Sequence, residues 1–435
     1  MRSTLCLLLC LVLCSLCPAQ SDWTALPTAP NFIGPMSKLD DVFFLNAELG
    51  WTLNGRGEVY KTEDGGQSWR LLTNLNEFLR SIKFVNEKVG YIGSLQGNFG
   101  GGDNIARLYK TTDGGETWTE LTDRISPRPI GICGLSVVGE QHIFGCGAFY
   151  SPARFYKSTD GGETWTNQDL SAYAIALVDV HFSSPDTGFV VGSSSQAGGG
   201  GLILRTTDGG DSWTAVHQTG IASDLLWKIQ QLDGQHLFAS IAGVSIDNGA
   251  RILRSSDGGL SWESKQVDQG EVHLQGVGFL SPQHGFAGGF FPGVYETRDG
   301  GDNWALINTG ANYNRFQKMD DSLMYASGHT IYQYGEAILT STQQPELLQA
   351  PPYSLTYSPN PASDRLQVNY QLDQATHLDL SLYDASGKKV LELHSGGHAS
   401  GSYQRDVAVG HLPRGIYLLA FLSREGDILQ KVVLE

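Results

Sequence analysis

The segment Thr111–Trp118, TTDGGETW, decides the fold of this chain because close copies of it recur at regular intervals. Five further copies keep the order of a hydroxyl residue, Asp, Gly and Trp: Thr62–Trp69, Ser158–Trp165, Thr206–Trp213, Ser255–Trp262 and Thr297–Trp304. Successive Trp residues lie 42–49 positions apart. A period of this length predicts a repeat architecture in which each unit is one supersecondary structure. We call the six segments the octapeptides.

Each octapeptide lies between two short apolar or aromatic runs and is therefore predicted to be the turn of a β-hairpin. Its Asp can accept hydrogen bonds from backbone N–H groups two residues on, and its glycines adopt positive φ without steric cost. Its Trp offers a ring face for packing and an N–H that needs an acceptor. We expect the Trp to pack against the neighbouring unit.

The octapeptides resemble the Asp-box, or BNR repeat, S/T-x-D-x-G-x-S/T-W. In that family the motif sits on the hairpin between the third and fourth strands of a propeller blade. Six acidic metal or catalytic sites are one interpretation, but a structural turn needed by every blade is the one we favour. The structural residues are then Asp64, Trp69, Asp113, Trp118, Asp160, Trp165, Asp208, Trp213, Asp257, Trp262, Asp299 and Trp304.

Between the octapeptides, each unit repeats the same series of extended runs and turns, which predicts four short strands, or one propeller blade. Three more runs follow the last octapeptide, at 315–319, 323–326 and 330–334. Ser21–Leu26 resembles the end of an octapeptide and can supply the fourth strand of that blade. We therefore predict an all-β chain with a seven-bladed β-propeller over residues 20–335, closed by its N-terminal strand. Six and eight blades are the alternatives.

Residues 1–19 are predicted to be a secretory signal peptide. A basic start precedes the apolar run Leu5–Leu16, and a small residue follows at Ala19. The run is too short to span a membrane. Because Cys14 and Cys17 lie near its end, a lipoprotein signal is the alternative.

Residues 336–352 are predicted to be a linker, and alternating apolar runs over 353–435 predict a small Ig-like β-sandwich. This segment resembles the C-terminal sorting domain of the type IX secretion system of Bacteroidetes. The matching positions include Asn360, Pro361, Gly387, Gly415, Tyr417 and Lys431. The resemblance implies export to the cell surface or medium through the type IX machinery. An ordinary Ig-like binding module is the alternative.

The composition restricts the partners and the chemistry. A formal net charge of −16 does not suit a polyphosphate backbone, so we expect no nucleic-acid partner. Cys133 and Cys146 follow the signal segment, and a two-residue turn at Gly139-Glu140 would place them opposite each other. A disulfide and a pair of buried thiols both fit this arrangement. No metal or cofactor motif is present in the sequence, and we expect a monomer that binds neither.

We expect the ligand on the face opposite the octapeptides, where the loops between second and third strands meet the blade-to-blade connections. The candidate binding residues are Arg80, Phe99, Arg128, Tyr150, Trp227, Asp247, Phe290, Tyr313 and Arg315. Aromatic and Arg side chains of this kind suit a protein or a glycan.

Two families compete for the function. Leu79–Phe84 followed by Gly90–Gly93 resembles the blade pattern of photosystem II assembly factor propellers, which are non-enzymatic protein-binding scaffolds. Sialidases and related glycoside hydrolases also carry Asp-boxes, but their early Phe-Arg-Ile-Pro element is absent. Glycosidases need a pair of carboxylates, which Glu77, Asp103 or Asp247 could supply. We therefore expect a secreted or cell-surface binding propeller, with a secreted glycoside hydrolase as the alternative.

Overall fold

The computed structural model describes most of the chain, and the described residues are 23–32, 38–95, 106–147, 152–243, 249–270, 273–335, 353–372, 375–384, 389–423 and 426–435. The predicted signal peptide and linker lie outside these residues. The chain divides into two compact units, Met1–Leu339 and Thr340–Glu435.

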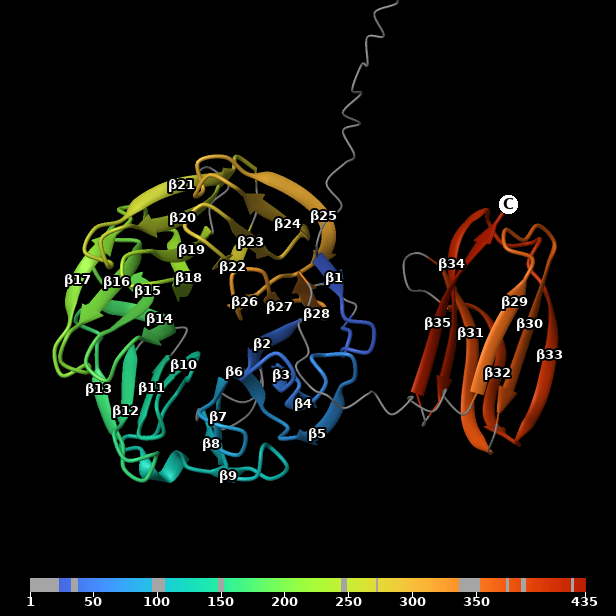
Figure 1. The fold of residues 1–435 in the computed structure, drawn as a ribbon, viewed down its shortest axis with the longest axis horizontal. Helices are drawn as coiled ribbons and strands as arrows, with labels where there is room; N and C mark the ends of the chain where they lie inside the picture. Colours follow the sequence, from blue (N-terminus) through green and yellow to red (C-terminus); the bar gives the residue numbers. More distant parts are fainter. Residues whose placement is uncertain are drawn as a thin grey trace, which may run out of the picture. The chain divides into compact units, whose positions relative to one another are not determined.

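The first unit is a ring of seven four-stranded antiparallel sheets, each of which is one blade (Figure 1). The prediction of a seven-bladed propeller is confirmed. From the innermost strand outward, blade 1 is β2 (Leu39–Phe44), β3 (Gly50–Asn54), β4 (Glu58–Thr62) and β5 (Arg70–Asn74); blade 2 is β6 (Phe78–Phe84), β7 (Gly90–Leu95), β8 (Leu108–Thr111) and β9 (Thr119–Glu120). Blade 3 is β10 (Gly134–Val138), β11 (His142–Gly147), β12 (Arg154–Ser158) and β13 (Thr166–Asp169), and a 3-10 turn, η1 (Thr122–Arg124), precedes it.

The remaining blades follow the same order. Blade 4 is β14 (Ala174–Phe182), β15 (Gly188–Ser194), β16 (Gly201–Thr206) and β17 (Thr214–Gln218); blade 5 is β18 (Asp224–Gln231), β19 (Leu237–Gly243), β20 (Ala250–Ser255) and β21 (Glu263–Asp268). Blade 6 is β22 (Leu274–Phe279), β23 (Gly285–Gly289), β24 (Pro292–Thr297) and β25 (Ala305–Ala311); blade 7 is β26 (Arg315–Lys318), β27 (Met324–Ser327), β28 (Ile331–Tyr334) and β1 (Trp23–Ala25).

The seventh blade joins the two ends of the propeller. Strand β1 pairs antiparallel with β28, so that Trp23 lies opposite Tyr334. The buried Trp23 ring makes edge contacts with its neighbours, and its centroid lies 5.0 Å from that of Phe286 in blade 6. The ring therefore closes without an unpaired edge at its seam, which removes the usual site of edge-to-edge aggregation.

Each octapeptide is a turn whose carboxylate is saturated with hydrogen bonds. In the second copy, Asp113 Oδ1 accepts from the hydroxyl of Thr111 (2.7 Å) and the backbone N–H of Thr117 (2.9 Å). Asp113 Oδ2 accepts from the Thr117 hydroxyl at 2.5 Å. These bonds, those from Thr117 first, lower the pKa of Asp113 to about 2. Equivalent bonds lower the pKa values of Asp160, Asp208, Asp257 and Asp299 to about 2, as the structural interpretation of the octapeptides requires.

A second set of bonds fixes each octapeptide beside another turn of its own blade. The N–H of Gly114 donates to the carbonyl of Lys88, in the turn between the first and second strands (2.8 Å). The equivalent bonds join Gly65 to Glu48, Gly161 to Gln141, Gly209 to Asp186, Gly258 to Gln235 and Gly300 to Gln283. The octapeptides and the turns after the innermost strands therefore share one face of the ring, which we call the octapeptide face.

The octapeptides also connect neighbouring blades. Phe84 ends the innermost strand of blade 2 and stacks on Trp51 of blade 1, with ring centroids 3.5 Å apart. Trp118 meets the edge of Phe84 at 6.1 Å, and Trp51 Nε1 donates to the carbonyl of Gly114 (2.9 Å). The same aromatic stack recurs at three other blade boundaries, in the pairs Phe44–Tyr325, Phe182–Phe144 and Phe279–Phe238.

A glycine opposite each stacked Phe makes room for its ring. Gly90 pairs with Phe84 across strands β6 and β7, and a Cβ atom on Gly90 would lie 2.6 Å from the Phe84 ring. Gly50, Gly188 and Gly285 hold the same position against Phe44, Phe182 and Phe279. This contact explains why the second strand of these blades begins with glycine.

The two cysteines are buried thiols, and the possible disulfide is not formed. The turn between their strands has three residues rather than the two we expected, because Val138 pairs with His142. The register is therefore shifted by one, and Gly134 rather than Cys133 lies opposite Cys146.

The second unit consists of two antiparallel sheets. One contains β29 (Tyr353–Ser358), β30 (Arg365–Leu372) and β33 (Gly401–Ala408); the other contains β31 (Thr376–Asp384), β32 (Lys389–His398), β34 (Gly415–Ser423) and β35 (Gly426–Leu434). Apolar side chains from both sheets, among them Val368, Leu380 and Phe421, form one buried core. The predicted β-sandwich is confirmed.

Replacing the second octapeptide glycine should cost far more stability than replacing an open turn glycine. Gly210 has φ +90°, and a Cβ there would lie 2.4 Å from the Phe155 ring of the preceding blade. Gly139 also has positive φ, but its Cβ would meet nothing within 4 Å. We expect Gly139→Ala to cost about 1–2 kcal/mol from backbone strain alone. Gly210→Ala should cost about 1–3 kcal/mol more, because Phe155 must move.

Urea unfolding of both variants measures this difference. Equal losses of stability in the two variants would show that the contact between Gly210 and Phe155 does not stabilise the boundary between the blades.

Candidate functional site

The innermost strands of the seven blades surround an axial channel, and five of them carry a β-bulge at the same position. The irregularities lie between Leu39 and Asp41, Leu79 and Ser81, Leu177 and Asp179, Leu226 and Ile229, and Leu274 and Gly276. A bulge inserts an extra residue and changes the direction of its side chain. The inserted residues include Asp40, Arg80, Trp227 with Lys228, and Gln275, and the contacts below show that they meet across blades.

One group of these residues, which we call the loop-side cluster, lies at the ends of the innermost strands away from the octapeptides. Lys38 Nζ and Trp227 Nε1 both donate to Asn314 Oδ1, at 3.0 and 3.1 Å. Arg80 forms an ion pair with Asp40, and its guanidinium lies 5.0 Å from the centre of the Trp227 ring. Burial, followed by the charge of Arg80, holds the pKa of Lys38 well below its usual value.

A second group, which we call the axial network, connects blades across the channel. Arg315 of β26 donates through Nε to Asp41 Oδ1 (3.0 Å) and through both Nη atoms to Asp179 (2.8 and 2.9 Å). Lys83 Nζ donates to the other oxygen of Asp41 at 3.0 Å. Asp41 lies in blade 1 and Asp179 in blade 4, so one guanidinium links three blades.

The charges of this network hold its carboxylates ionised. Burial alone would raise the pKa of Asp41, but Lys83 and Arg315 outweigh it and lower that pKa well below its usual value. At Asp179, burial raises the pKa and the charge of Arg315 lowers it, and the net result is again a lowered pKa. Neither carboxyl group is suited to donating a proton near neutral pH.

Lys228 differs from the other cations of the channel. Its side chain is buried, and its Nζ has no hydrogen-bond partner among the described residues. Burial, followed by the charge of Arg315, lowers the pKa of Lys228 to about 7. Lys228 is therefore charged in only part of the molecules at neutral pH.

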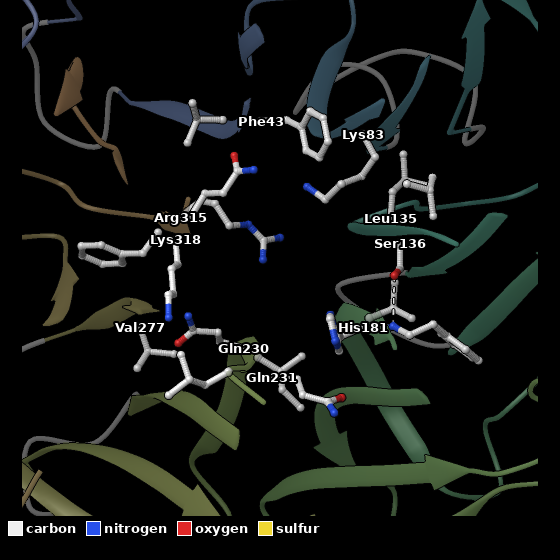
Figure 2. Close-up of a pocket in the computed structure, with 18 of the residues that line it drawn as sticks. Phe43, Lys83, Leu135, Ser136, His181, Gln230, Gln231, Val277, Arg315 and Lys318 are labelled. Carbon is white, nitrogen blue, oxygen red and sulfur yellow. Dashed lines mark hydrogen bonds between the residues drawn. The ribbon is translucent and has the colours of Figure 1, made fainter. Parts of the chain in front are cut away.

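A cavity of about 420 Å³ lies next to the axial network. It is lined by residues of all seven innermost strands, with Leu232 and Met319 from turns of the octapeptide face. Figure 2 shows the side chains of Lys83, Arg315 and Lys318 entering it from two sides, with His181 below Lys83 on the right of the view. We call it the channel-mouth cavity. Burial lowers the pKa of His181 to about 4, so this ring is neutral at neutral pH.

The structure brings four of the predicted binding residues to the channel. Arg80 and Trp227 belong to the loop-side cluster, and the Phe290 ring lies 4.6 Å from Lys38 Nζ in that cluster. Arg315 lies at the centre of the axial network and lines the channel-mouth cavity. The cavity nonetheless opens beside the octapeptide face, whereas we expected the site on the opposite face.

Two of the other predicted residues do not join them. Arg128 is exposed and forms an ion pair with Asp123 at 2.5 Å. Tyr313 is fully buried, and its hydroxyl donates to the carbonyl of Thr309 (3.0 Å), so its assignment as a binding residue is wrong. Phe99, Tyr150 and Asp247 lie outside the described residues.

The sequence analysis missed Lys38, Asp41, Lys83, Asp179 and Lys228. A signal for four of them was present, because charged residues interrupt the innermost strands in FLRSIKF, LDDVFF, AIALVDVHF and DLLWKIQQ. We interpreted these segments only as extended runs of the blades and assigned no role to their charged residues. The bulges that direct several of these side chains into the channel have no signature in the sequence.

The C-terminal unit is tied together by the residues that carried its resemblance. Asn360 Oδ1 accepts from the backbone N–H of Val433 (2.9 Å), which connects the end of β29 to the last strand, β35. The Tyr417 hydroxyl donates to the carbonyl of Pro413 at 2.6 Å. Gly415 has φ +151°, and Lys431 pairs with Leu418 between β35 and β34. Pro361 follows Asn360, and Gly387 lies outside the described residues.

Residues 357–435 match the secretion system C-terminal sorting domain. The match spans the sandwich almost from its first strand to its last residue. It indicates type IX secretion to the cell surface or the extracellular space. Within the described parts of the chain, no helix has the length and apolar character needed to cross a membrane.

The propeller is similar to several solved structures. YCF48 bound to D1 peptide has 17% identity and a TM-score of 0.53, covering 73% of this chain and 98% of that one. YCF48 from Cyanidioschyzon merolae also has 17% identity, with a TM-score of 0.55 and coverages of 72% and 98%. The Niastella koreensis GH74 enzyme has 13% identity and a TM-score of 0.55, covering 94% of this chain and 67% of that one. At these identities the similarity shows the fold alone. No curated protein matches the sequence.

The stability of the propeller should depend on pH through Lys228. In the unfolded chain a lysine keeps its proton up to a pKa of about 10.4. In the folded protein Lys228 loses its proton near pH 7, so between these values the unfolded state binds more protons and stability rises with pH. We expect Lys228→Met to flatten this rise and to be more stable than the wild type below pH 7, where the wild type buries a charge.

Urea midpoints measured from pH 6 to pH 10 test this expectation, with the exposed Lys88→Met as the control. Lys88→Met should retain the slope of the wild type. A Lys228→Met slope equal to that of the wild type would contradict the assignment.

Proposed function

We propose that this protein is an exported propeller that binds a protein or glycan ligand and catalyses no reaction of its own. The observation that carries the proposal is the state of the two axial carboxylates. Asp41 and Asp179 both bind Arg315 and are held ionised by it.

Glycoside hydrolysis by the usual route requires one carboxyl group that stays protonated and a second that is ionised. The axial carboxylates have lowered pKa values, and a guanidinium occupies the position between them. Glu77, a candidate for the pair, accepts a hydrogen bond from Arg107 at 2.7 Å. The other two candidates, Asp103 and Asp247, lie outside the described residues. The described carboxylates therefore favour binding over hydrolysis.

The similar structures support the proposal in one respect. One of them is the complex of YCF48 with D1 peptide, so a propeller of this fold can hold a peptide. A hydrolase is the competing function, because the fold is also similar to the Niastella koreensis GH74 enzyme.

The purified protein should release no reducing sugar from xyloglucan, mixed-linkage β-glucan or sialyl-lactose. The physical reason is that Asp41 and Asp179 are both held ionised, so neither can act as the proton donor. A reducing-end assay at pH 5–8 measures this. Hydrolysis that is abolished in Asp41→Asn or Asp179→Asn, with folding intact, would overturn the proposal.

Deletion of Tyr353–Glu435 should leave the propeller folded but hold it in the periplasm. The deleted residues belong to a separate compact unit, so the propeller core keeps its contacts. Cell fractionation of the deletion variant against the full-length protein tests the export, and thermal unfolding tests the fold. Normal appearance of the truncated protein in the medium would contradict the role of the C-terminal domain in export.

A further inference from the structure

We propose that the channel-mouth cavity binds an acidic peptide segment, an inference that rests on the proposed function of the propeller as a binding protein. The cavity measures about 420 Å³. Pockets of about 300–1,000 Å³ hold most small ligands, and a few peptide residues fill a similar space. Its walls are strands of a closed ring, so the site is largely formed before a ligand arrives.

The charge of the cavity selects an anion. Lys83, Arg315 and Lys318 line it, and no described Asp or Glu does. Asp41 and Asp179 lie behind this lining, where they neutralise part of the charge, and Lys228 adds to it. Three lining cations and the partly charged Lys228 face three carboxylates, Asp41, Asp179 and the exposed Asp321, so the local charge is slightly positive. This surplus occurs in a chain whose formal net charge is −16, so it is a local feature.

The cations can reach a ligand because their side chains retain some exposure: 17% for Lys83, 13% for Arg315 and 24% for Lys318. An ammonium group has three N–H donors. Lys318 Nζ uses two, on the carbonyl of Leu280 and on Asp321, whose side chain is 93% exposed. A ligand carboxylate can take the third donor, or replace the weakly held Asp321.

The lining of the cavity also includes a hydrogen-bond acceptor. Gln231 lines the cavity, and its Oε1 atom is buried without a hydrogen-bond partner among the described residues. A buried acceptor of this kind is costly unless something donates to it. A rotation of the Gln231 side chain that turned this oxygen toward the cavity would let a backbone N–H of a bound peptide satisfy it.

The rest of the lining favours a peptide over an acidic glycan. Most of the apolar lining side chains are aliphatic: Val42, Leu135, Val137, Val180, Ile229, Leu232, Val277 and Met319. Aliphatic side chains pack well against Leu, Val or Ala of a peptide. Sugar rings carry hydroxyl groups on most of their edges, and burying these against aliphatic carbon without hydrogen bonds is costly.

Fluorescence anisotropy with three labelled probes tests the site on the purified protein. The probes are an eight-residue peptide of alternating Glu and Leu, its Gln–Leu counterpart, and an oligogalacturonate. The variants are Lys318→Glu and, as a matched control, Lys88→Glu, which makes the same charge change at an exposed position of the octapeptide face. We expect the Glu–Leu peptide to bind at least tenfold more tightly than the Gln–Leu peptide. Lys318→Glu should weaken it tenfold or more, and Lys88→Glu less than twofold.

Each other outcome overturns the proposal in a distinct way. If Lys318→Glu and Lys88→Glu weakened peptide binding equally, the peptide would be held by general electrostatic attraction and not in the channel-mouth cavity. Binding of the oligogalacturonate alone would exclude the peptide but leave the proposed function intact. No binding of any probe, together with hydrolysis of a glycan in the reducing-end assay, would overturn both.

Discussion

The propeller depends on one repeated interaction, the saturation of each octapeptide carboxylate by hydrogen bonds from its own turn. That turn presents a glycine N–H to the adjacent turn of the same blade, and a Trp edge to the aromatic stack at the blade boundary. Because both contacts start from the same eight residues, a correctly formed turn sets the hairpin and the blade boundary together. A repeat fold gains much of its stability from the contacts between neighbouring units. This explains why the motif recurs in nearly every blade.

The octapeptide turns and aromatic stacks hold the blades together at their boundaries, and polar side chains occupy the axis of the ring. Buried ion pairs contribute little net stability, because desolvation offsets most of their attraction. The axial network nevertheless satisfies both carboxylates of Asp41 and Asp179 through Arg315, with Lys83 completing the set. The network itself is balanced, with two cations and two carboxylates, and Lys228 lies buried beside it without a described hydrogen-bond partner. A buried lysine of this kind costs stability when it is charged, so Lys228 fits the proposed recognition of an anion better than a purely structural role.

The two ends of the channel differ in chemistry. The loop-side cluster is closed by mutual contacts among Lys38, Arg80, Trp227 and Asn314, most of which are buried. The channel-mouth cavity has partly exposed cations and an unused acceptor. The octapeptide face therefore combines the structural turns at its periphery with a candidate binding site at its centre. The C-terminal domain, by contrast, bears on where the protein acts and not on what it binds.

The sequence by itself determined the repeat and the sorting domain, because each rests on local patterns, and it favoured seven blades over six or eight. The octapeptide specifies its own turn through residues within eight positions, and Trp23 marks the closing strand through its resemblance to an octapeptide end. Only the tertiary structure decided the site. The register of Cys133 and Cys146 changed with a single turn residue, and Tyr313 proved to be core. Asp41, Asp179 and Arg315 meet because three distant blades converge on one axis and because bulges redirect residues of the innermost strands. Such convergence depends on which residues of distant blades face one another across the closed ring, which no local pattern of residues encodes.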